Sequence, residues 1–150
     1  MRFELVDRVL ELTTERIVTI KHVSSAEEYL QDHFPTFPVL PGVLMLEMLV
    51  QSARRLAEAR PEWNAAGPPL VLGRVRALKY GRLVKPGDTL RAEVLLTAAP
   101  VGKGEPWEFR ASAVVNEPGA VQEPPVAVSG RLTLRPVKAS AAVVSAGLPG

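Results

Sequence analysis

The sequence predicts an α+β fold in which an antiparallel sheet wraps around one long helix. Only one segment, Gly42 to about Arg60, is long and rich in helix-forming residues. Six other segments are rich in β-branched residues and partly alternate between apolar and polar side chains. The helical segment is apolar on nearly all sides, so it needs cover on most of its faces.

Two strands are expected before the helix, at Arg8–Leu12 and Arg16–Val23, joined by a short turn. Two serines at 24–25, followed by Ala-Glu-Glu-Tyr-Leu, predict an N-cap and a short helix with acids in its first turn. The stretch Asp32–Leu40 holds two prolines and two phenylalanines, which favours an ordered loop.

The long helix is predicted to begin beside Pro41, whose fixed φ suits a first helical position and whose missing N–H leaves nothing unsatisfied there. Pro61 ends it. From Gly42 to Ala53 its only polar side chains are those of Glu47, Gln51 and Ser52.

Four strands are expected after the helix, separated by turn sequences such as Pro86-Gly87-Asp88. They are Leu70–Tyr80, Thr89–Ala98, Trp107–Asn116 and Val126–Arg135. We therefore expect one domain over residues 1–137 and a flexible tail over 138–150. The element order fits a hot-dog fold, with the sheet around a central helix, although a sheet with one flanking helix has the same pattern.

The composition excludes several classes of function. The chain has no cysteine, which rules out disulfides, thiolate metal sites and cysteine nucleophiles. A net charge of +2 does not indicate a nucleic-acid binder. No apolar run is long enough to span a bilayer, and the first residues lack the unbroken apolar stretch of a secretory signal. We expect a cytoplasmic protein with no nucleic-acid or membrane partner.

Three features near the start of the helix point to acid–base chemistry. His33 can take a proton near neutral pH, and Phe34 beside it provides an apolar setting. Glu47 follows on the helix, and the first N–H groups, those of Gly42 and Val43, can receive an oxygen that gains negative charge. A base, an acid and an oxyanion donor are what is needed to remove a proton beside a thioester carbonyl and expel a β-hydroxyl.

Each feature also has a structural interpretation. A histidine in a Phe/Pro loop is often only hydrogen-bonded, and Pro41-Gly42 is a common helix entry. Glu47 belongs to a polar stripe that could be the solvent face. The stripe consists of Glu47, Gln51, Arg54, Arg55 and Glu58. His22 falls in a predicted strand, where we expect a structural or surface role.

The stretch from Leu5 to Leu90 resembles the 3-hydroxyacyl-[acyl carrier protein] dehydratases of the FabZ/FabA type. The matching residues are Leu5-Val-Asp-Arg-Val-Leu-Glu-Leu12, His33-Phe-Pro35, Pro38, Pro41-Gly42-Val43, Glu47, Gln51 and Val84-Lys-Pro-Gly-Asp-Thr-Leu90. The fourteen-residue step from His33 to Glu47 agrees with the family spacing. Beyond Leu90 only the strand pattern is similar.

The resemblance implies a hot-dog fold that forms a homodimer, or a trimer of such dimers. Each active site would lie at the dimer interface, with the histidine from one subunit and the acid from the other. The substrate would be a (3R)-3-hydroxyacyl thioester on the phosphopantetheine of acyl carrier protein or CoA, and the product a trans-2-enoyl thioester. No metal or redox cofactor is implied.

The resemblance also implies roles for single residues. His33 would be the general base for the α-proton, and Glu47 would orient and protonate the leaving hydroxyl. The Gly42 N–H would bind the thioester carbonyl, and Gln51 would support Glu47 by a side-chain hydrogen bond. The remaining members of the predicted site are Val43, Pro41 and Phe34.

The chain departs from the family pattern at two places in this region. Thr36 follows the His-Phe-Pro sequence where glycine is usual, and Val50 replaces the usual alanine before glutamine. Much of the family segment before Leu5 is missing, which affects the expected substrate gate and chain-length preference. Thioester hydrolysis, enoyl isomerisation and a non-catalytic carrier-binding subunit stay open as alternative functions.

A basic stretch follows the helix. Within residues 74–85 there are five cations and no acid. The cations are Arg74, Arg76, Lys79, Arg82 and Lys85. Because acyl carrier proteins are acidic, this stretch predicts a carrier-docking patch. The alternative is that these are simply outward residues of one strand and its turn.

Overall fold

The structure, a computed structural model, describes residues 4–27, 30, 38–102 and 104–138. Its elements are β1 (Arg8–Leu12), β2 (Arg16–His22), α1 (Gly42–Glu58), β3 (Leu70–Tyr80), β4 (Thr89–Ala98), β5 (Trp107–Asn116) and β6 (Val126–Pro136). Every predicted strand is confirmed to within one residue at either end. The long helix is confirmed too, although it ends at Glu58, two residues earlier than expected.

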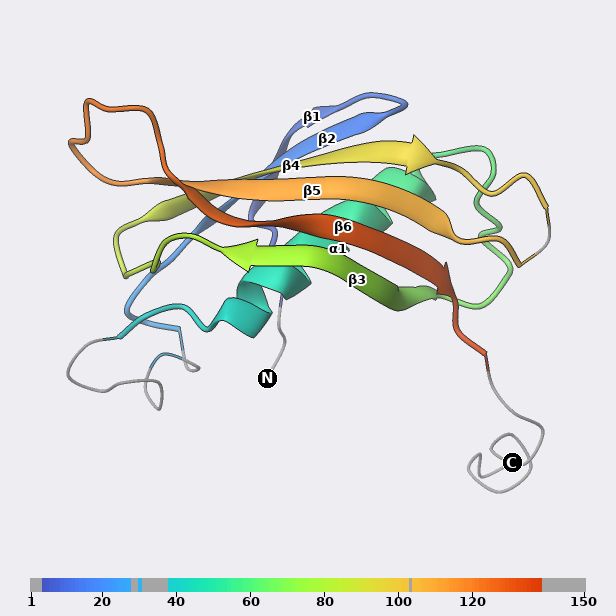
Figure 1. The fold of residues 1–150 in the computed structure, drawn as a ribbon, viewed down its shortest axis with the longest axis horizontal. Coiled ribbons are helices and arrows are strands. Elements are labelled where there is room, and N and C mark those ends of the chain that lie inside the picture. The colour runs from blue at the N-terminus through green and yellow to red at the C-terminus, as the bar shows by residue number, and fades with distance from the viewer. Residues whose placement is uncertain (1–3, 28–29, 31–37, 103, 139–150) are drawn as a thin grey trace, which may run out of the picture.

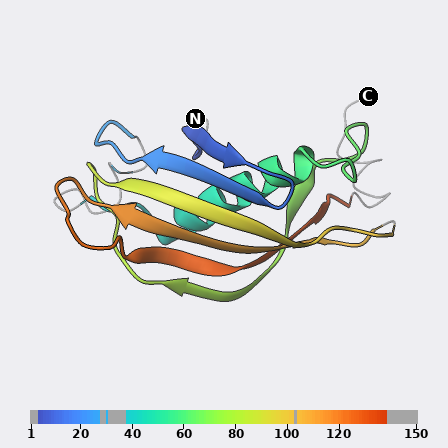
Figure 2. The same ribbon diagram turned by 90° about the horizontal axis from the view of Figure 1, so that it is seen from above.

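The six strands form one antiparallel sheet in the order β1-β2-β4-β5-β6-β3. Helix α1 crosses one face of this sheet and contacts every strand from β2 to β6. Figures 1 and 2 show the sheet curving around the helix, with β1 and β3 at its two edges. This is the predicted hot-dog arrangement.

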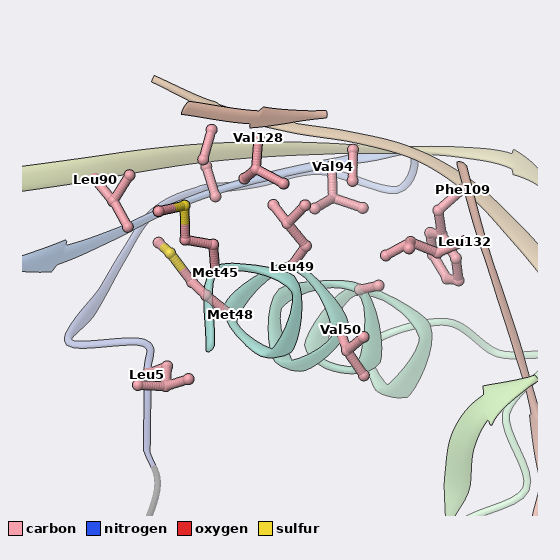
Figure 3. Close-up of a cluster of buried hydrophobic side chains, with 14 of the residues drawn as sticks. Leu5, Met45, Met48, Leu49, Val50, Leu90, Val94, Phe109, Val128 and Leu132 are labelled. Carbon is pink, nitrogen blue, oxygen red and sulfur yellow. The ribbon is translucent and has the colours of Figure 1, made fainter. Parts of the chain in front are cut away.

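The core lies between α1 and the concave face of the sheet. Helix residues Met45, Met48 and Leu49 are at most 3% exposed. They pack against buried side chains that alternate along the strands. Those drawn in Figure 3 include Leu90, Val94, Phe109, Val128 and Leu132. The buried apolar stripe of the helix thus explains why this element is held against the sheet.

The opposite face of α1 has much less cover. Near the start of the helix Val43 is 67% exposed, and Leu44 and Leu46 are only half-buried. Leu5, 2% exposed, lies on the side of the helix away from the sheet (Figure 3). The expectation that the helix is buried on most faces is therefore met only in part within the described chain, where the sheet covers one side and the segment that contains Leu5 covers some of the other.

The turn at Pro86-Gly87-Asp88 holds Val23, the residue that follows β2. Gly87 has φ +99° and donates its N–H to the carbonyl of Val23 at 2.8 Å. The Asp88 carbonyl accepts the Val23 N–H at 3.0 Å, and its carboxylate accepts the Lys85 N–H at 2.9 Å. Glycine suits this positive φ, so this motif secures the end of β2.

The short helix predicted after the two serines is confirmed only in part, because Leu30 is in a 3₁₀-helical conformation and donates its N–H to the Glu27 carbonyl at 3.1 Å. Residues 24–27 form a turn, in which the Ser24 hydroxyl accepts the Ala26 N–H at 3.0 Å. The serine satisfies a nearby N–H as expected of a cap, but no helix follows within these residues. Residues 28–29 and the predicted tail from 139 lie outside the described residues.

Candidate active site

The N-terminus of α1 is open. Pro41 precedes the first turn with φ −58° and ψ 137°, and its carbonyl accepts the N–H groups of Leu44 and Met45. The N–H groups of Gly42 and Val43 have no acceptor among the described residues. No side chain of the described residues caps this end, and the first turn holds no acid. The positive end of the helix dipole is thus available to an oxygen that carries negative charge.

The space beside Gly42 is filled by an aromatic ring. A Cβ built on Gly42 would lie 3.0 Å from Cε1 and 3.1 Å from Cζ of Tyr80. Tyr80 is the last residue of β3 and is 50% exposed, so its ring flanks the helix start while one side faces solvent. A side chain at position 42 would therefore need the Tyr80 ring to move slightly. Sequence patterns do not predict this contact, because it joins residues 38 positions apart.

Glu47 lies one and a half turns further along the helix, where it is half-buried. The Gln51 side chain donates a hydrogen bond from Nε2 to Oε1 of Glu47 at 3.2 Å, as was predicted. The Gln51 Oε1 in turn accepts the backbone N–H of Leu5 at 2.8 Å. Because Gln51 is bound at both ends, its amide is held in one orientation and positions the carboxylate of Glu47.

These contacts decide how the polar stripe of the helix is arranged. Glu47 and Gln51 are half-buried beside the segment that contains Leu5, whereas Glu58 at the other end is exposed. The stripe therefore begins under cover and emerges into solvent toward the C-terminus of α1. Its structural interpretation as a solvent face holds only for its last turn.

The structure brings together part of the predicted site. Pro41, Gly42, Val43, Glu47 and Gln51 lie on the first two and a half turns of α1 or next to it. His33 and Phe34 lie outside the described residues. Among the residues that are described, no group of three or more His, Cys, Asp or Glu side chains is placed to hold a metal ion.

His22 has the structural role that was expected of it. It is exposed at the end of β2, its Nδ1 lies 3.1 Å from the Thr89 hydroxyl, and its backbone N–H donates to Asp7 Oδ2 at 2.8 Å. The carboxylate of Asp7 also lies 3.5 Å from Lys21 Nζ. The Leu-Val-Asp-Arg sequence thus ties the N-terminal segment to β2.

The predicted docking patch is divided by the structure. Arg74, Arg76 and Lys79 are exposed on β3. Arg82 instead forms an ion pair with Glu117, which lies in the loop that follows β5. Its charge is therefore compensated. Arg74, Arg76 and Lys79 remain together on β3, whereas Lys85 is exposed in the stretch between β3 and β4.

Comparisons with known proteins identify the family of the chain. The model of the ApeI-like family, described as ApeI dehydratase, matches residues 10–117, well beyond Leu90. The chain is 43% identical over 106 residues to the 3-hydroxyacyl-[acyl-carrier-protein] dehydratase FabZ of Chloroflexus aggregans, covering 69% of this chain and 72% of the relative. The corresponding enzyme of Oceanobacillus iheyensis is 40% identical, with 69% and 74% covered.

Solved structures support the fold. The dehydratase heterocomplex ApeI:P from Xenorhabdus doucetiae aligns with a TM-score of 0.59 and 18% identity, over 90% of this chain and 99% of that one. The smu.793 protein from Streptococcus mutans, bound to acetyl CoA, aligns with a TM-score of 0.62 and 13% identity, over 91% and 92%. At such identities the likeness concerns the fold alone, whereas the FabZ relatives and the family model cover most of the chain. The chain belongs to the 3-hydroxyacyl-[acyl carrier protein] dehydratase family.

Proposed function

We propose that this protein dehydrates a (3R)-3-hydroxyacyl thioester on acyl carrier protein to the trans-2-enoyl thioester, in fatty-acid or related lipid or polyketide biosynthesis. The observation that carries the proposal is the half-buried Glu47, oriented by Gln51 and placed after an open helix N-terminus, in a chain of the dehydratase family. CoA is the alternative carrier. In this proposal no metal or redox cofactor takes part, and the enzyme works in the cytoplasm.

The proposed reaction assigns one step to each group. His33 removes the α-proton, and the negative charge that develops on the thioester oxygen is received by the N–H groups of Gly42 and Val43. Glu47 donates a proton to the β-hydroxyl, which leaves as water. The two proton transfers balance, so the proton held by His33 returns to Glu47 through solvent before the next turnover.

A second copy of the chain is part of the proposal. The exposed Val43 and the half-buried Leu44 and Leu46 form an apolar surface next to the site. Strand β3 lies at the edge of the sheet, without a further strand beside it in the described chain. We propose that these features pair in a homodimer, or a trimer of such dimers, in which His33 of one subunit meets Glu47 of the other.

The first experiment is turnover of 3-hydroxyacyl thioesters of several chain lengths, on carrier protein and on CoA, followed by the ultraviolet absorption of the enoyl product. We expect His33→Ala and Glu47→Ala each to lower the rate by about 10²–10⁴-fold. Glu58→Gln, at an exposed glutamate of the same helix, is the matched control and should keep full activity. A wild-type protein that is inert at every chain length would contradict the proposal.

The same assay separates the rival activities. Release of free thiol would indicate thioester hydrolysis, and a shift of the double bond without loss of water would indicate enoyl isomerisation. Binding of the carrier thioester without turnover would indicate a non-catalytic subunit.

Mixing two inactive variants tests the shared site. If each site takes His33 from one subunit and Glu47 from the other, a dimer of one His33→Ala and one Glu47→Ala subunit keeps one intact site of two. Random re-association should then restore roughly a quarter of the wild-type activity. No recovery, with mixed dimers verified by mass, would place both residues of a site in the same subunit.

A further inference from the structure

Three arginines form a row across the sheet on the face away from α1. Arg76 on β3 is directly opposite Arg131 on β6, and Arg131 is directly opposite Arg110 on β5. These three strands lie side by side in Figures 1 and 2. All three arginines are exposed, while Phe109 and Leu132, which are next to Arg110 and Arg131 in the chain, are buried in the core. Because side chains alternate along a strand, the arginines face outward.

The row is not neutralised by the described part of the chain. None of its three members has an ion pair or a side-chain hydrogen bond to another described residue. Elsewhere on the sheet Arg16 is paired with Glu93 and Glu11 at 2.6 Å each. Like charges directly opposite each other destabilise a sheet. An uncompensated row of three is therefore a feature that an anionic partner would stabilise.

The row borders a hollow of about 440 Å³. Its lining adds a fourth arginine, Arg74, and the hydroxyls of Thr97 and Thr133, while Glu108 is the one acid. Arginine presents a planar fork that binds carboxylates through two hydrogen bonds at once. The chemistry of this surface therefore selects acidic groups, spread over the three adjacent strands.

The position of the row relative to the active site is set by β3. Arg74 and Arg76 lie on the same strand as Tyr80, whose ring contacts Gly42 at the helix start. Arg76 and Tyr80 are four positions apart on β3, with a bulge between Arg76 and Lys79, so their Cα atoms are at most about 14 Å apart. A partner seated on the row is thus close to the end of β3 around which a flexible arm could enter the site.

We propose that the row of Arg76, Arg131 and Arg110, with Arg74, is the surface on which an acidic face of the acyl carrier docks. This inference rests on the proposed function, since it assumes that the substrate arrives on a carrier protein. It redefines the patch predicted from the sequence. Arg74 and Arg76 are kept, Lys79 and Lys85 lie outside the row, and Arg82 is ion-paired with Glu117. Two arginines from distant strands join.

The test compares two double variants with the same change in net charge. Arg110→Gln/Arg131→Gln neutralises the row, whereas Arg55→Gln/Arg82→Gln removes two exposed arginines that are ion-paired to Glu4 and Glu117. Both are assayed with a 3-hydroxyacyl carrier thioester at several salt concentrations, and with the same acyl group on CoA and on N-acetylcysteamine. Thermal unfolding checks that each variant is folded.

For the row variant we expect kcat/KM on the carrier to fall about tenfold at low salt, mainly through KM, and to depend less on salt. Activity on N-acetylcysteamine and CoA thioesters should be unchanged, and the control variant should behave as wild type on all three. Equal carrier kinetics in the two variants would overturn the inference. An equal loss on the CoA thioester would overturn it too, because the row would then recognise phosphate.

A failure of the proposed function can be told apart from a failure of this inference. If the wild type is inert on all three thioesters, the dehydratase assignment fails. Fluorescence anisotropy of a labelled carrier still measures docking in that case. Weaker binding by the row variant than by the control supports the docking surface, and equal binding overturns it.

Discussion

Helix α1 takes part in two polar side-chain pairs that differ in their surroundings. In the core, the Ser52 hydroxyl donates to the Met48 carbonyl at 2.9 Å and lies 2.8 Å from the Thr19 hydroxyl, and both Ser52 and Thr19 are 0% exposed. On the other side, Gln51 donates to Glu47, and both are half-buried. Gln51 and Ser52 are neighbours on the helix. Ser52 nevertheless faces the sheet, whereas Gln51 lies beside the segment that contains Leu5.

The two pairs differ in how much of their hydrogen-bonding capacity is unused. In the core, the Ser52 hydrogen is used by Met48, so Thr19 is the donor to Ser52 and the pair is closed. The Glu47 carboxylate can accept about four hydrogen bonds, and the described chain gives it one, from Gln51. A closed buried pair serves the fold, whereas a positioned carboxylate with unused capacity is available to a substrate.

Glu47→Gln should have the largest effect, and on activity alone. The amide keeps the size of the side chain but cannot supply the proton, so we expect kcat to fall by about 10²–10⁴-fold. The free energy of unfolding should change by less than about 0.5 kcal/mol, since the site is only half-buried. Turnover and urea unfolding of the same preparation measure both quantities.

A large loss of stability in this variant would contradict the assignment, because it would make Glu47 a structural residue. Unchanged turnover would contradict it as well, since the carboxylate would then have no part in proton transfer.

Ser52→Ala should lower the stability of the protein but not its activity. Removing the hydroxyl leaves the buried Thr19 without its acceptor, which should lower the free energy of unfolding by about 1–3 kcal/mol. Activity per folded molecule should be kept. The double variant Thr19→Val/Ser52→Ala removes both polar groups and should recover much of the loss. If the double variant is as unstable as the sum of the single ones, the two hydroxyls do not act as a pair.

Most of the fold was predictable from the sequence because it depends on local patterns. Alternation marks β5, where every second side chain is buried, and Pro41 and Pro61 enclose the helix. Residues 24–27 form a turn before the 3₁₀-helical Leu30, and the sequence did not separate the two because a serine signal is common to caps and turns. Strand order depends on pairing between distant segments, and so it did not follow from these patterns.

The candidate site was predictable in part for a similar reason. Glu47 and Gln51 are four residues apart on a helix, and this spacing alone predicts their contact. The contacts of Tyr80 with Gly42 and of Leu5 with Gln51 join residues far apart in the chain. The row formed by Arg76, Arg131 and Arg110 likewise needs the register of three strands, and a linear search found only one of its members.

Gln51→Ala should lower both the activity and the stability, each by a smaller amount. It removes the donor that orients Glu47 and the acceptor of the Leu5 N–H, a group in a residue that is 2% exposed. We expect about a tenfold lower kcat and a loss of about 1 kcal/mol in stability. Gln51→Glu, which keeps an acceptor for Leu5 but loses the donor, should restore stability more than activity. Equal recovery of both would show that Gln51 acts only through the fold.

Arg55→Ala should have the smallest effect and marks the limit of the polar stripe. Arg55 lies one turn beyond Gln51 and pairs with Glu4 at 3.3 Å, with both side chains about half exposed. An exposed ion pair contributes about 0–1 kcal/mol and is screened by salt, so stability should change little at low salt and not at all at high salt. Activity should equal that of wild type, as measured by turnover at both salt concentrations. A loss of activity would mean that the functional part of the stripe extends beyond Gln51, and that the segment around Glu4 helps to hold Glu47 in place.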